Sequence, residues 1–128
     1  MKLLLDTHAL LWWFTDDARL SPRVRGLIGD ETNEILVSAA SAWEVATKHR
    51  LGKLTGVDDA VLRFQELVAA DGFTPLPISH RHGLRAGTYP VPHRDPFDRM
   101  LAAQAELESM PLVTLDAELA QFGIERIW

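Results

Sequence analysis

Short runs of consecutive apolar residues alternate along the chain with longer stretches in which apolar positions recur every three or four residues. Such runs are typical of strands buried on both faces, and the longer period is typical of helices with one buried face. The runs predict strands at residues 2–6, 34–38, 73–78, 111–116 and 124–128. The periodic stretches predict helices at residues 7–14, 21–29, 39–51, 57–72, 79–87, 96–107 and 117–122. Prolines indicate that residues 73–78 form an edge or irregular strand, and residues 88–96 form the one substantial loop.

This order of elements predicts the fold class. Strands and helices that alternate from end to end indicate a parallel sheet covered by helices on both faces. We therefore expect a three-layer α/β/α sandwich with a central, mostly parallel sheet. The 128 residues suit a single domain, residues 1–128, large enough to bury roughly two-thirds of its unfolded surface.

Composition narrows the class of function. The formal charge is −5, from 13 basic and 18 acidic residues, which argues against binding nucleic acid through bulk positive charge. The absence of cysteine excludes disulfides and thiolate metal sites. No apolar run approaches the ~20 residues that cross a bilayer, and the first apolar run is interrupted by Asp6 and His8. These features predict a cytoplasmic protein.

Four acidic residues occupy equivalent places in the predicted fold. Asp6 and Asp116 each end a strand, Glu44 lies in the first turns of the helix after residues 34–38, and Asp98 lies in the first turn of the helix after Pro96. Each has a structural explanation by itself. Asp6 and Asp116 suit N-caps, Asp98 suits the positive end of a helix dipole, and Glu44 completes an S-x-x-E capping box with Ser41.

Capping does not explain why the four acids occur together. The helices are expected to begin at one edge of the sheet, where ligands of parallel sheets bind, so the carboxylates should converge. Two charges about 4 Å apart repel by roughly 4 kcal/mol at an effective dielectric of 20, whereas a cap contributes about 1 kcal/mol. A divalent cation reverses this repulsion, and all-oxygen ligands favour Mg²⁺ or Mn²⁺. We expect Asp6, Glu44 and Asp98 to be the principal ligands, with Asp116 binding a second cation directly or through water.

Asp95 stands three residues before Asp98 and is the ambiguous acid of the set. Asp95 followed by Pro96 is a favoured helix start, and a helix that needed only a start signal would need only one of the two aspartates. The sequence leaves open whether Asp95 is a cap or an additional ligand.

The four motifs together resemble a known family. Asp6 in "LLLDTH", Glu44 in "SAWEVATKHRLGKL", Asp98 in "DPFDRMLAAQA" and Asp116 in "LVTLD" are similar to the acidic quartet of PIN-domain ribonucleases, and most similar to VapC-type toxins of bacterial toxin–antitoxin pairs. Thr114 resembles the threonine or serine that the family carries near its last acid, and Asp95 is outside the common quartet. The resemblance implies cleavage of RNA with Mg²⁺ or Mn²⁺, a homodimer, and a small antitoxin protein whose C-terminal segment blocks the site.

Basic and aromatic residues near these motifs have two interpretations each. The cations that could contact RNA phosphates, with Arg99 the best placed, are also the kind of side chain that covers a solvated helix face: Lys48, Arg50, Lys53, Arg94 and Arg99. His8 and His93 could orient substrate or could be polar surface groups. For Trp12 and Trp13, packing in the core or in a dimer is favoured over stacking on bases.

Other functions remain as alternatives. A phosphatase of the haloacid dehalogenase type also places an aspartate after its first strand, but its D-x-D motif would need an acid where this chain has His8. A receiver domain would need a late lysine, and none follows Lys53. A PIN-like module that only binds would need a broken acidic set, which is intact here.

Overall fold

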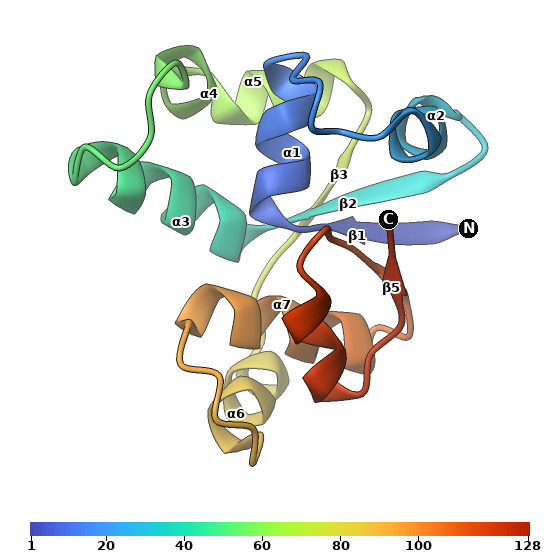
Figure 1. Cartoon of the computed structure of the whole chain (residues 1–128), viewed down its shortest axis with the longest axis vertical. Helices are drawn as coiled ribbons and strands as arrows, with labels where there is room; N and C mark the ends of the chain where they lie inside the picture. Colours follow the sequence, from blue (N-terminus) through green and yellow to red (C-terminus); the bar gives the residue numbers. More distant parts are fainter.

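A five-stranded parallel sheet forms the centre of the molecule. In the computed structural model, which describes all 128 residues, the strands are β1 (Lys2–Leu5), β2 (Glu34–Ser38), β3 (Thr74–Leu76), β4 (Leu112–Val113) and β5 (Arg126–Ile127). Their order across the sheet is β3-β2-β1-β4-β5, and every neighbouring pair is parallel. Figure 1 shows β1 and β2 side by side at the middle of the fold. The expected parallel sheet is confirmed, including β3 as an edge strand that carries Pro75.

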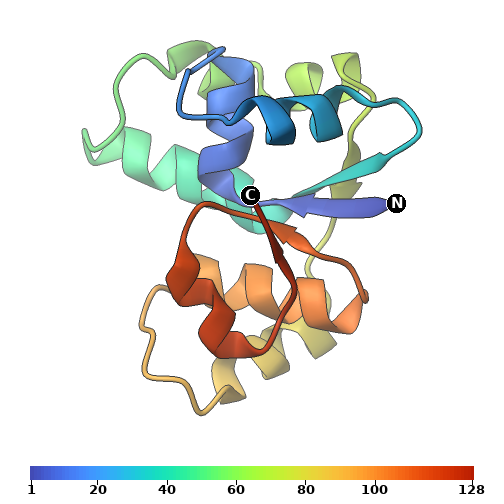
Figure 2. The same cartoon turned by 45° about the vertical axis from the view of Figure 1, so that its right-hand side comes forward.

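Helices cover both faces of this sheet. Alternate residues of β1 point to opposite faces, so Leu3 and Leu5 belong to one buried cluster and Leu4 to another. The first cluster includes residues of α1 (Thr7–Phe14), α2 (Pro22–Gly29) and α5 (Phe64–Ala70), and the second includes residues of α6 (His80–Thr88), α7 (Pro96–Leu107) and the 3₁₀ helix η1 (Ala117–Phe122). Figures 1 and 2 show these two sets of helices on opposite sides of the strands. The three-layer sandwich is confirmed.

The remaining two helices extend from the carboxyl end of the sheet. Helix α3 (Ala39–Arg50) follows β2 directly, and α4 (Asp58–Leu62) packs against it. A third apolar cluster joins them to α1 through Leu11, Val45, Val57 and Ala60. The longest helices, α3 and α7, have 12 residues each, and no helix has the length and apolar composition needed to span a membrane.

Residues 57–72 differ from the expectation of one continuous helix. The structure has two helices, α4 and α5, separated at Arg63, where φ is −120° and ψ is 23°. The two halves pack on different surfaces: Ala60 of α4 joins the cluster around α3, whereas Val68 of α5 joins the cluster on the sheet. One straight helix would not bury both faces, so the backbone turns between them.

Candidate metal and active site

Asp6 follows β1 directly and is nearly buried. Its side chain is the N-cap of α1, where Oδ1 accepts a hydrogen bond of 2.7 Å from the Ala9 amide, and only 7% of the residue is exposed. Burial raises the pKa of the Asp6 carboxyl, and hydrogen bonds from the Thr114 hydroxyl and the Ala9 amide partly oppose the rise. The charge of Glu44 raises this pKa further. Thr114 therefore lies beside Asp6, and Glu44 is close enough for its charge to act there.

Glu44 has no capping role, contrary to the S-x-x-E expectation. The N-cap of α3 is Ser38, whose Oγ accepts from the Ala40 amide at 3.0 Å, so Ser41 and Glu44 lie inside the helix. The Ser41 hydroxyl instead accepts a hydrogen bond from the Thr7 hydroxyl at 3.0 Å. Glu44 is only 3% exposed, and its carboxylate forms an ion pair with Lys48. A buried carboxylate without a local structural role requires another explanation.

The structure distinguishes between the two aspartates at the start of α7. Asp95 is the cap, because its Oδ1 accepts from the amides of Phe97 at 2.9 Å and Asp98 at 3.2 Å. Asp98 caps nothing, and its Oδ2 lies 2.9 Å from Nε2 of His93. Burial raises the pKa of Asp98 to about 6; the hydrogen bond with His93 opposes this rise, and the charges of Asp95 and Glu44 add to it.

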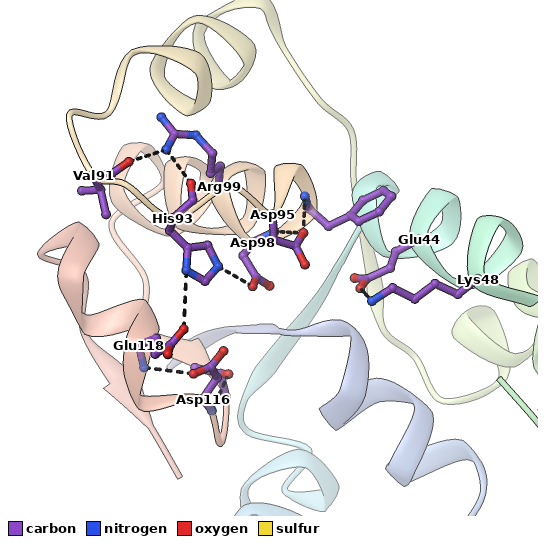
Figure 3. Close-up of polar contacts among 11 residues, drawn as sticks. Glu44, Lys48, Val91, His93, Asp95, Asp98, Arg99, Asp116 and Glu118 are labelled. Atoms are coloured by element: carbon purple, nitrogen blue, oxygen red, sulfur yellow. Dashed lines mark hydrogen bonds and ion pairs between the residues drawn. The ribbon is translucent and has the colours of Figure 1, made fainter. Parts of the chain in front are cut away.

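Asp116 is the one exposed acid of the four. It caps η1, where Oδ1 accepts from the Glu118 amide at 2.9 Å, and its own amide donates to Thr114 Oγ1 at 3.1 Å. Glu118 also approaches the site, with Oε2 3.7 Å from Nδ1 of His93. Figure 3 shows Asp116 and Glu118 on one side of Asp98 and Glu44 with Lys48 on the other. The sequence pattern did not identify Glu118, because an exposed acid in a first helical turn has no distinctive spacing.

Arg99 binds backbone carbonyls of α6 and of the loop that follows it. Its guanidinium donates to four backbone carbonyls, those of Ala86 at 2.8 Å, Tyr89 at 2.7 Å, Val91 at 2.8 Å and His93 at 2.9 Å. Arg99 therefore fastens the loop between α6 and α7, and through it holds His93 beside Asp98 (Figure 3). Sequence spacing does not reveal these carbonyls, which occupy four of the N–H donors of Arg99.

The two early tryptophans pack within the protein, as expected. The ring of Trp13 lies 6.1 Å from Phe73, and the ring of Trp12 lies 5.8 Å from Trp128, measured between centroids. Both are partly buried against the cluster that covers the first face of the sheet.

The donor set fits a hard divalent cation in its chemistry. Asp6, Glu44 and Asp98 offer carboxylate oxygens with little access to water, and the low-dielectric surroundings that raise the pKa of Asp6 and Asp98 would strengthen their attraction to Mg²⁺ or Mn²⁺. The side chains are not arranged as a ligand shell: no three Asp, Glu or His side chains are close enough together to hold a metal ion. Lys48 forms an ion pair with Glu44, and His93 contacts Asp98.

Comparison with known proteins identifies the family. The PIN domain family model matches residues 3–125, and the chain belongs to this family. Over 58 residues, or 45% of this chain, the sequence is 40% identical to Ribonuclease VapC16 of Mycobacterium tuberculosis. The match covers 41% of the length of that protein.

Solved structures share the whole fold at low sequence identity. A chain in the VapBC2 structure from Rickettsia felis, bound to a promoter DNA fragment, has a TM-score of 0.73, with 13% identity over 99% of this chain and 98% of the other. A chain in the VapBC-1 structure from nontypeable Haemophilus influenzae has a TM-score of 0.69, with 17% identity over 99% and 97%. Membership of the PIN family sets aside the haloacid dehalogenase and receiver alternatives.

Proposed function

We propose that this protein is a metal-dependent endoribonuclease that hydrolyses RNA phosphodiester bonds, and that it is the toxin of a toxin–antitoxin pair. The observation that carries the proposal is the pair Glu44 and Asp98, which lie at the carboxyl end of the sheet and cap no helix. Their charges act on each other through a partly dry site, as the raised pKa of Asp98 indicates. The likeness to Ribonuclease VapC16 supports an RNA substrate.

The roles of the side chains follow from their surroundings. Asp6, Glu44 and Asp98 are the proposed principal ligands of Mg²⁺ or Mn²⁺. Asp116, which is exposed, is the proposed ligand of a second cation, directly or through water. A bound cation would polarise the scissile phosphate and make an attacking water more acidic. Thr114 steadies Asp6, and His93 steadies Asp98.

The first test is RNA cleavage by Asp98→Asn. The amide has nearly the same shape but lacks the charge that holds a cation, so we expect cleavage to fall more than about 100-fold, since loss of outer-shell partners alone costs 10–100-fold. Asp95→Asn is the matched control, because asparagine caps a helix as well as aspartate does. The control should retain cleavage within a few-fold and both variants should keep the wild-type fold by circular dichroism.

Two results would refute the assignment. Wild-type rates in folded Asp98→Asn would remove Asp98 from the site. Equal loss in both variants would make Asp95 a ligand rather than only a cap. A wild-type protein that binds RNA without cleaving it in Mg²⁺ or Mn²⁺ would instead favour a PIN-like binding module.

A small antitoxin and a homodimer are the proposed partners. The VapBC structures contain such toxin–antitoxin assemblies in other organisms. An acidic site in a protein of charge −5 suits an inserted arginine, whose planar guanidinium pairs with carboxylates. Co-expression with the neighbouring small open reading frame should give a complex whose affinity falls when Mn²⁺ is added. Loss of inhibition on replacing the antitoxin arginine would support this mode, and a metal-indifferent complex would exclude it.

A further inference from the structure

Lys48 places a positive charge inside the acidic site. It lies one turn after Glu44 on α3, and its ammonium donates a hydrogen bond to Oε2 of that residue. The Glu44 side chain is 4% exposed and has no other hydrogen-bond partner, whereas the Lys48 side chain remains 28% exposed. The buried carboxylate therefore depends on this one cation for its charge balance, and the lysine has a path back to solvent.

The ammonium also lies within reach of the acids at the start of α7. The positive charge of Lys48 acts on Asp95 and Asp98 as well as on Glu44. Figure 3 shows the Lys48 ammonium and the Glu44 carboxylate together on the side facing Asp95 and Asp98. Lys48 is therefore shared electrostatically among carboxylates that belong to two helices.

A bound cation and the Lys48 ammonium would compete for the Glu44 carboxylate. A divalent ion at Glu44 and an ammonium at Glu44 carry the same sign and repel strongly in surroundings of low dielectric. The Glu44 carboxylate that faces Lys48 is not positioned with two other acids for a metal ion. A lysine has a flexible four-carbon stem and can move its charge away without moving the helix.

We infer that Lys48 is the counter-ion of Glu44 in the metal-free site. Its ammonium pairs with Glu44 until a divalent cation displaces that ammonium. The inference rests on the proposed metal site and adds a role that the metal ligands do not supply. Lys48 stabilises the protein without metal, and it weakens metal binding because the cation must first displace the ammonium. It acts through Glu44 and is a positioning residue, not a metal ligand.

The test measures Mn²⁺ binding by calorimetry and metal-free stability by thermal unfolding in EDTA. Lys48→Met keeps the apolar stem and removes the charge, so we expect Mn²⁺ to bind at least about ten-fold more tightly, equivalent to about 1.4 kcal/mol. The melting temperature in EDTA should fall, and saturating Mn²⁺ should restore it. Lys53→Met is the matched control, because it removes the same charge from an exposed position beyond the end of α3 and should match the wild type in both measurements.

Unchanged or weaker Mn²⁺ binding in Lys48→Met would overturn the inference, since it would make Lys48 a surface pair or a support for the metal-binding position of Glu44. Lys48→Arg keeps the charge and should retain wild-type affinity, and Lys48→Gln should tighten binding if the methionine variant does not fold. If Lys53→Met tightened Mn²⁺ binding as much as Lys48→Met, the effect would come from net charge rather than from the position of Lys48. That result would also overturn the inference. Wild-type protein that binds Mn²⁺ no better than Glu44→Gln would refute the proposed metal site itself, independently of the Lys48 variants.

Discussion

The molecule contains two buried polar clusters that are built in opposite ways. One lies where α7 meets β2 and α6: Gln104 is fully buried, its Oε1 accepts from the Ser38 hydroxyl at 2.5 Å, and its Nε2 donates to the Pro77 carbonyl at 3.2 Å. His82 adjoins it, with Nε2 2.9 Å from Glu108 Oε1. The other is the carboxylate site at the start of α7, where Asp6, Glu44 and Asp98 bring like charges toward one another.

The difference shows what each cluster is built to do. At Gln104 itself, neutral donors meet neutral acceptors, and the only charged group is Glu108, at the partly exposed edge of the cluster. Such pairing is how buried polar groups contribute to a stable and specific core. Around Glu44, burial raises the pKa of neighbouring carboxyls and one lysine supplies the balancing charge. Carboxylates that are buried close to one another, with their pKa values raised, are typical of a functional site. Removing the amide of Gln104 should therefore destabilise the protein, whereas neutralising an acid of the carboxylate site should stabilise the metal-free protein.

The largest expected effect comes from breaking the neutral cluster. Gln104→Leu keeps the size of the side chain but leaves the Ser38 hydroxyl and the Pro77 carbonyl without their partner, so we expect the free energy of unfolding to fall by about 2–4 kcal/mol. Urea denaturation measures this loss. Gln121→Leu, at an exposed position, should change stability by less than about 0.5 kcal/mol. A Gln104→Leu protein as stable as the wild type would show that the hydrogen bonds around Gln104 contribute nothing net.

Sequence patterning could predict the fold because the signals involved are local. The alternation of Leu3, Leu4 and Leu5 between two clusters follows from the period of a strand, and the start of α7 follows from Asp95 and Pro96. Gln104 shows the limit. It lies in the apolar stripe of α7, and its partner Ser38 is 66 residues away, so only the tertiary structure reveals that the position is polar and satisfied.

The candidate site was predictable in part for the same reason. Topology brought Asp6, Glu44 and Asp98 to the carboxyl end of the sheet, but their relation to Lys48, His93 and Arg99 depends on side-chain direction. Helix spacing permits Lys48 to reach Glu44, yet it does not tell whether the pair faces solvent or the acidic site. The capping-box interpretation was wrong because α3 begins at Ala39 with Ser38 as its N-cap. The pattern required Ser41 to be the N-cap, about one turn later.

The next effect concerns metal and distinguishes the charged cluster from the neutral one. Because a ligand that binds only the folded state stabilises it, Mn²⁺ at 100 times its dissociation constant should add about 2.7 kcal/mol, seen as a higher melting temperature. Replacing all four acids, with Asn at positions 6, 98 and 116 and Gln at position 44, should remove the response. Gln104→Leu should keep it despite its lower starting stability. An equal Mn²⁺ response in the quadruple variant would place the cation elsewhere.

The smallest effect is the pH dependence that Asp98 gives to the protein in EDTA. Its pKa is raised from 3.8 to about 6 in the folded state, chiefly by burial, so folding favours the protonated form. The stability that Asp98 contributes is therefore present below about pH 4 and is lost as pH rises through about 6. The side chain is 22% exposed, and after allowance for screening the loss should be about 1–2 kcal/mol.

Asparagine resembles the protonated acid, so Asp98→Asn should match the wild type near pH 4 and exceed its stability at pH 7. Asp116→Asn, which removes an exposed carboxylate, should keep the wild-type pH profile in urea denaturation. If Asp98→Asn were instead the less stable protein at pH 7, the ionised Asp98 would be stabilising, and the carboxylate site would resemble the neutral cluster after all.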